Sequence, residues 1–190
     1  PAAILLLPLL PVVVLLAAGR RLDRGADLLS IGCLLLSLCL SVALFIVSLS
    51  TGGAAVQARP LVVSLPWIAA GGVSLPFGFL VDHLSSFMAI IVSGLGTLVL
   101  IYSIHYMRGD SLYRRYFVYM SFFCFSMLGV VFSANLFMAY VFWELVGLGS
   151  YFIIGFWFYR PAAADDPEYQ QRKARHATGI DERRLSPAYA

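Results

Sequence analysis

The chain has 190 residues, of which 61% are hydrophobic and 12% are charged, and its mean hydropathy is +0.86. This balance excludes an ordinary soluble globular domain and indicates a membrane protein. The formal net charge is only +3, and the basic residues stand at the ends of apolar runs without forming a basic face. A nucleic-acid partner is therefore excluded as well.

Five apolar segments come close to the roughly 20 residues that a helix needs to cross a bilayer. They lie at 2–18, 28–50, 84–107, 116–134 and 136–158. The first contains two prolines and has the length of a signal peptide, but "GRRLDRG" follows it and no basic segment precedes it. The sequence thus predicts an all-α multi-pass membrane protein, with a bundle of about five transmembrane helices in residues 1–160.

Arginine is unevenly divided among the four predicted loops. The first and third loops hold three arginines each, whereas the second holds one and the fourth none. By the positive-inside rule, the first and third loops face the cytoplasm, and the N-terminus faces outward. The arginines, in loop order, are Arg20, Arg21 and Arg24, then Arg59, then Arg108, Arg114 and Arg115.

Two segments differ from the spans. In the long outer loop, "VSLPFGF" follows "AAGG" and alternates apolar with small or turn residues, which predicts a short β-hairpin at the membrane surface. Residues 161–190 are polar and mixed in charge, so we expect a solvated cytoplasmic loop or tail.

We expect no metal or cofactor site, because the three cysteines lie in apolar runs without a CxxC pair and no nucleotide-binding glycine motif occurs.

The fifth apolar segment carries one acid, Glu144, three residues from its centre at Gly147. A charged side chain at the centre of a membrane helix costs about 2.5 to 3.5 kcal/mol on insertion scales, so such an acid normally serves transport, proton relay or pairing. On a helix, Glu144 shares a face with Tyr140, Gly147 and Tyr151, and Ser150 lies near it. We therefore expect Glu144 to transfer protons, with these four residues in support.

Small residues and hydroxyls on that face predict that Glu144 points into a helix bundle and that Phe142, Leu145 and Phe156 face lipid. A purely structural alternative is a protonated Glu144 that holds helices together by hydrogen bonding. Four other polar residues stand at the ends of the third span and are expected to be interfacial groups: Asp82, His83, His105 and Asp110.

Several stretches together resemble a known family. "FGFLVDHLSSFM", "IYSIHYMRGD", "RRYFVYMSFFCFSML" and above all "WELVGLGSYFIIGFW" are similar to subunit L, or chain 5, of NADH-quinone oxidoreductase (respiratory complex I). The resemblance covers roughly residues 1–163 and implies an N-terminal fragment of an antiporter-like membrane subunit. In that family the chain continues into a sixth helix soon after "GFW", so residues 161–190 are expected to be an inserted loop before such a helix, or else a frameshifted end.

The resemblance implies a proton-translocating subunit in the membrane arm of an enzyme complex, in the cell (inner) membrane and in contact with other membrane-arm subunits. It implies that NADH, FMN, iron–sulfur clusters and quinone are bound by partner subunits and that this chain has no redox centre. The family's essential acid maps onto Glu144, and its partner lysine would lie beyond Ala190. Two alternatives remain: the related membrane component of a multisubunit sodium/proton antiporter, and a structural helix bundle.

Overall fold

The computed structural model describes residues 1–18, 25–50, 61–70, 73–107 and 112–156, with only the backbone for 61–70 and 73–77. The chain divides into two units, Pro1–Ile153 and Ile154–Ala190. The first unit contains all the packing described below. The predicted tail at 161–190 and Asp110 lie outside the described residues.

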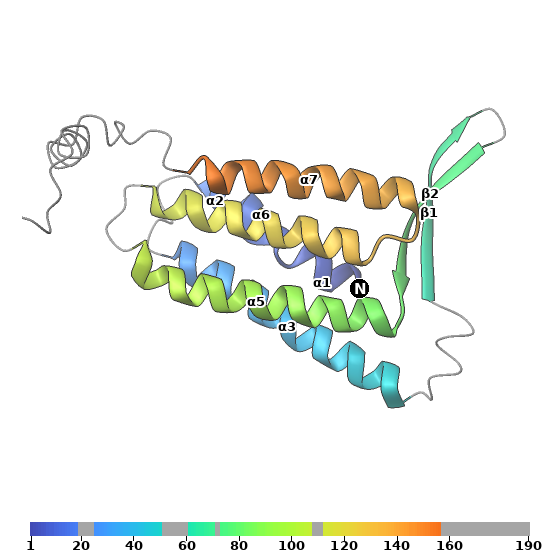
Figure 1. Ribbon diagram of the computed structural model, residues 1–190, viewed down its shortest axis with the longest axis horizontal. Coiled ribbons are helices and arrows are strands. Elements are labelled where there is room, and N and C mark those ends of the chain that lie inside the picture. The colour runs from blue at the N-terminus through green and yellow to red at the C-terminus, as the bar shows by residue number, and fades with distance from the viewer. Residues whose placement is uncertain (19–24, 51–60, 71–72, 108–111, 157–190) are drawn as a thin grey trace, which may run out of the picture. The chain divides into compact units, whose positions relative to one another are not determined.

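Helices dominate the described part of the chain (Figure 1). Three of its helices are long and apolar enough to cross a membrane, namely α3 (Ala26–Ser50), α5 (His83–Tyr106) and α7 (Leu136–Ile154). The other helices are α1 (Ala2–Leu6), α2 (Leu9–Ala18) and α6 (Tyr113–Val131). The chain therefore has the helical membrane fold that the sequence predicts.

The first apolar run is interrupted between α1 and α2, at Leu7 and Pro8. Proline has no backbone N–H and cannot donate to the helical ladder. Before the proline, the Leu7 N–H still donates to the carbonyl of Ala3, four residues earlier, at 3.0 Å. After it, the Leu10 N–H donates to the carbonyl of Leu7, only three residues earlier, at 3.2 Å. Leu7 keeps helical backbone angles, so the chain continues in nearly the same direction.

α3 and α5 lie side by side, and both bury stripes of small hydroxyl residues (Figure 1). Many of these hydroxyls donate to the carbonyl one turn earlier, as Thr97 does to Ser93 at 2.7 Å. Others join helices, since Ser37 donates to the Ile4 carbonyl of α1 at 2.9 Å. The buried hydroxyl residues of the two helices are Ser30, Ser37, Ser41, Ser48, Ser85, Ser86, Ser93, Thr97 and Ser103.

Such small residues allow close helix approach in a membrane, where apolar attraction between helices is weak. Three helices meet at Gly96 of α5. A Cβ atom there would lie 2.7 Å from the Cys124 Sγ of α6 and 2.9 Å from a Leu34 methyl group of α3. We did not predict this packing from the sequence, although serine recurs on one face of the 28–50 segment.

α7 packs against α6 through aromatic rings and glycines. The ring of Phe142 lies directly against Gly129, and it meets Phe125 edge-on with the ring centroids 5.7 Å apart. Farther along, Phe152 stacks on Tyr119 at 5.0 Å. One side of α7 is thereby fixed to the bundle.

Two antiparallel strands, β1 (Leu61–Ala70) and β2 (Val73–Val81), precede α5. The second edge of β2 contacts the turn between α6 and α7, where the Leu80 N–H donates to Phe132 and the Ala134 N–H donates to Gly78, each at 3.0 Å. Figure 1 shows β2 crossing the ends of α6 and α7. Backbone hydrogen bonds therefore join the start of α5 to the α6–α7 turn.

Candidate functional site

Glu144 lies well inside α7. The helix has 19 residues, and Glu144 follows its first residue, Leu136, by eight positions, or roughly 12 Å at 1.5 Å per residue. α7 contains no lysine, arginine or second acid. Glu144 therefore has no charged partner on its own helix.

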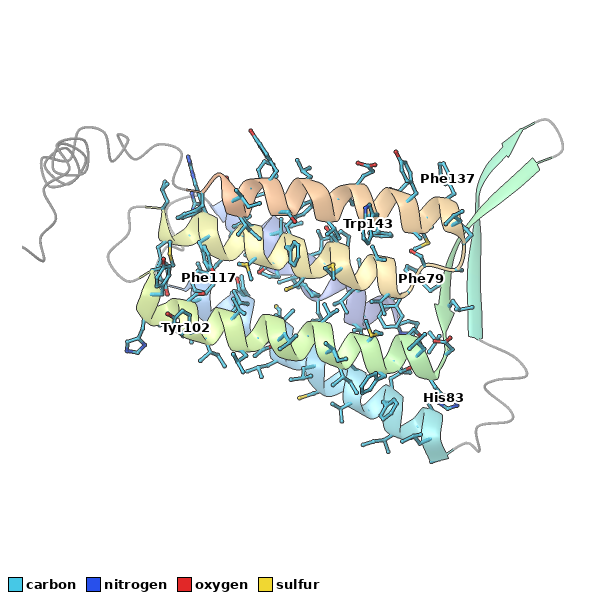
Figure 2. The ribbon with its side chains drawn as sticks, viewed as in Figure 1. Phe79, His83, Tyr102, Phe117, Phe137 and Trp143 are labelled. Carbon is cyan, nitrogen blue, oxygen red and sulfur yellow. The ribbon has the colours of Figure 1, made fainter. Side chains whose placement is uncertain are left out.

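The side of α7 that carries Glu144 is exposed. Glu144 and Gly147 are both exposed, and Tyr140 and Tyr151 keep 60% and 71% of their surface accessible. Side chains project from α7 on the side away from α6 (Figure 2). The structure thus brings four of the five predicted site residues onto one open face, while Ser150 is half-buried at its border.

The prediction that Phe142 and Leu145 face lipid is wrong. Phe142 is only 6% exposed, and Leu145 packs against the core that contains Phe142. Phe156 lies beyond the end of α7, in the second unit. The physical reason is that lipid and protein interior are equally apolar, so a phenylalanine is suited to either. Gly129 on α6, where the ring of Phe142 lies, decides which one Phe142 meets.

α7 is also the least covered of the three span-length helices. In the most apolar 18-residue stretch of each helix, 17% of α7 is buried, against 28% of α3 and 33% of α5. Much of its uncovered surface is the Glu144 face. An exposed acid on a membrane-length helix needs a polar neighbour or water when the helix is in a bilayer.

Tyr140 precedes Glu144 by one helical turn in α7. These residues are four apart and so lie one above the other on the same face. On the opposite side of Glu144, a Cβ atom at Gly147 would meet nothing within 4 Å. Glu144 is therefore flanked on its face by the exposed Tyr140 on one side and by open space at Gly147 on the other.

The polar residues at the start of α5 have structural partners. Asp82 caps the helix, since its carboxylate accepts from the Ser85 N–H at 2.6 Å and its own N–H donates to the Ser85 hydroxyl at 2.9 Å. The ring of His83 hydrogen-bonds the hydroxyl of Ser48 at the end of α3. Both residues hold helix ends in place.

At the other end of α5, His105 is exposed in the last turn. Within the described ranges, His, Cys, Asp and Glu side chains form no group of three or more that could hold a metal ion. The chemistry of the described residues therefore centres on the face of Glu144.

The fold and the site together define the class of protein. It is a helical membrane protein in which one helix carries an exposed face with a single acid. Comparison with known proteins narrows that class. Residues 67–117 match the family described as NADH-Ubiquinone oxidoreductase (complex I), chain 5 N-terminus. The resemblance to the N-terminal part of chain 5 that the sequence predicts is thus confirmed.

Individual relatives carry the same kind of name. The chain is 59% identical over 98 residues to NAD(P)H-quinone oxidoreductase subunit 5, chloroplastic, of Mutisia acuminata, and 58% identical over 99 residues to the Ipomoea purpurea protein of the same name. Each match covers 52% of this chain but only 13% and 14% of the respective relative. These relatives are subunits of an enzyme complex, and the chain corresponds to a small part of their length.

Proposed function

We propose that this chain is the N-terminal part of a proton-translocating membrane-arm subunit of an NADH:quinone oxidoreductase, and that Glu144 transfers protons in it. The observation that carries the proposal is the exposed Glu144 face of α7, in a chain similar to complex I chain 5. An acid deep in a span is costly, and an unpacked face around it suits a polar partner from outside the described helices.

That partner would be a basic side chain from another segment of the full protein. The chain has one lysine, Lys173, in the polar tail, and the helices that the structure describes contain none. A nearby cation favours the ionised carboxylate, and its withdrawal favours uptake of a proton. A basic group that approaches and leaves Glu144 would thereby make proton uptake and release alternate.

The rest of the assembly follows from the same proposal. Residues 1–160 would form the N-terminal transmembrane bundle, and 161–190 a cytoplasmic loop before a further helix. NADH, FMN, iron–sulfur clusters and quinone would be held by partner subunits, and the other membrane-arm subunits would surround this one. The complex would lie in the cell (inner) membrane.

Substitution of Glu144 by Gln tests the proton-transfer role, because it removes the titratable proton and preserves size and hydrogen bonding. In the full-length protein, assembled in its complex and sealed in vesicles, we expect Glu144→Gln to lower NADH-driven proton pumping. The matched control is His105→Gln, which removes an exposed titratable group from α5 and should leave pumping unchanged.

Unchanged pumping in a well-assembled Glu144→Gln complex would refute the role. The two alternatives, a sodium/proton antiporter and a structural helix bundle, predict different results for these variants. Proton movement that depends on Glu144 but needs no quinone reduction would favour the sodium/proton antiporter. Loss of assembly in Glu144→Ala, with full pumping in Glu144→Gln, would favour the structural bundle.

A further inference from the structure

Two serine hydroxyls are buried in the helix bundle without a hydrogen-bond partner among the described residues. They belong to Ser30 of α3 and Ser121 of α6, each only 1% exposed. The other buried serine and threonine hydroxyls of the described helices are all bonded, as Ser126 is to the Phe122 carbonyl at 2.8 Å. A hydroxyl that leaves water without gaining a partner destabilises the fold, and protein interiors contain very few of them. A ligand that bonds to both serines would remove this cost.

The two serines lie at about the same level of the bundle. α3 and α6 are in contact, and Figure 1 shows that they run in the same direction. Leu34 of α3 and Cys124 of α6 come together around Gly96 of α5. Ser30 stands four residues before Leu34, or about 6 Å along the helix axis. Ser121 stands three residues before Cys124, or about 4.5 Å toward the same end.

Water is the ligand that suits this level of the bundle. The surrounding core cluster consists of hydrophobic side chains from both helices, so it offers no charge to an ion. A serine hydroxyl has one donor and two acceptor positions, and water matches both kinds. Buried waters typically make about three hydrogen bonds to polar groups that otherwise lack a partner. We propose that one water molecule is bound between α3 and α6 and bridges the hydroxyls of Ser30 and Ser121.

This water site is separate from the proposed proton transfer. Glu144 belongs to the exposed face of α7, whereas both serines are buried in α3 and α6. The water joins these two helices by hydrogen bonds at a level where the neighbouring contacts are apolar. Its role is therefore to hold α3 and α6 in register.

A high-resolution map tests the site directly. In the full-length protein, assembled in its complex, cryo-electron microscopy at a resolution that shows ordered water should reveal a density peak between the two serines. The peak should lie about 2.5 to 3.0 Å from each hydroxyl oxygen. The proposal is overturned if each hydroxyl instead donates to the carbonyl four residues earlier, with no peak between them. A peak within bonding distance of only one serine also contradicts the bridge.

Substitutions supply an independent test, measured as the thermal unfolding midpoint of the full-length protein in detergent. If one water serves both hydroxyls, Ser30→Ala and Ser121→Ala should each lower the midpoint, and the double variant should lower it by less than the sum. Two hydroxyls that simply lack partners predict the opposite sign, because alanine removes an unsatisfied group and raises the midpoint. Either a raised midpoint or fully additive losses would overturn the proposal.

The matched control is Ser126→Ala. Ser126 is an equally buried serine of α6, and its hydroxyl already bonds to the Phe122 carbonyl. Its effect on the midpoint should therefore add to that of Ser30→Ala without coupling. Coupling of Ser30 to Ser121 and not to Ser126 would assign the shared partner to the proposed position, whereas equal coupling to both would contradict it.

Discussion

Gly129 of α6 lies against the ring of Phe142 of α7, so close that any side chain on Gly129 would overlap the ring. Phe142 is otherwise buried with residues of α6 and α5. The contact fixes the rotation of α7 about its own axis, and rotation decides where the opposite face points. The exposure of Glu144 is therefore a consequence of where Phe142 packs.

Gly129→Ala should destabilise the contact between α6 and α7. The added methyl group overlaps the ring near its attachment atom, so the whole side chain must move, and overpacking of this kind typically costs about 1 to 3 kcal/mol. Thermal unfolding of the purified full-length protein in detergent would show a lowered midpoint. The matched control is Gly32→Ala on α3, where a Cβ meets nothing within 4 Å.

A second substitution makes that test specific. Phe142→Leu vacates part of the space, so Gly129→Ala should cost less in a Phe142→Leu background than alone. Equal costs in the two backgrounds would contradict the contact.

Asp82→Ala should weaken the first turn of α5. Both hydrogen bonds between Asp82 and Ser85 form a capping box, and removal of an N-cap side chain costs about 0.5 to 2 kcal/mol. Faster amide hydrogen exchange should appear in the first turn of α5 and not in its last turn. Asp82→Asn preserves an acceptor and should exchange more slowly than Asp82→Ala; equal rates in both variants would argue against the cap.

The arginine distribution predicts the orientation of the helices. A cysteine in place of His105, at the arginine-rich end of α5, should react with a membrane-impermeant maleimide only from the cytoplasmic side. A cysteine in place of Leu136, which is 87% exposed at the start of α7, should react only from the outside. Both variants need a background in which Cys33, Cys39 and Cys124 are replaced. Reaction of both cysteines from the same side would contradict the predicted topology.

Apolar length was sufficient to predict the helices, because a bilayer demands nearly uninterrupted apolar runs and internally satisfied backbones. The acid face of α7 was also predictable, since Glu144 is its only charge and the helical period places Tyr140 and Gly147 beside it. The outward direction of that face within this chain was not predictable. The fit of the Phe142 ring against Gly129 determines that direction. Both residues are non-polar, so the polarity of the sequence does not indicate the contact.

The small-residue packing of α3 and α5 was missed for a related reason. Serine is a mildly unfavourable residue in an apolar span. Its hydroxyl can nevertheless donate a hydrogen bond to a carbonyl of the preceding turn, and its small volume lets another helix approach. Ser37 and Thr97 illustrate both uses. A repeat of small hydroxyl residues at helical spacing in an apolar segment is the signal that would have revealed the contact.

The hydrogen bonds between β2 and the α6–α7 turn use only main-chain atoms. These bonds therefore depend on the amide hydrogens of Leu80 and Ala134 and on no particular side chain. Proline is the one amino acid that lacks this hydrogen. At these two positions, a proline should break the link between β2 and the α6–α7 turn, whereas any other amino acid keeps the hydrogen that the bond needs.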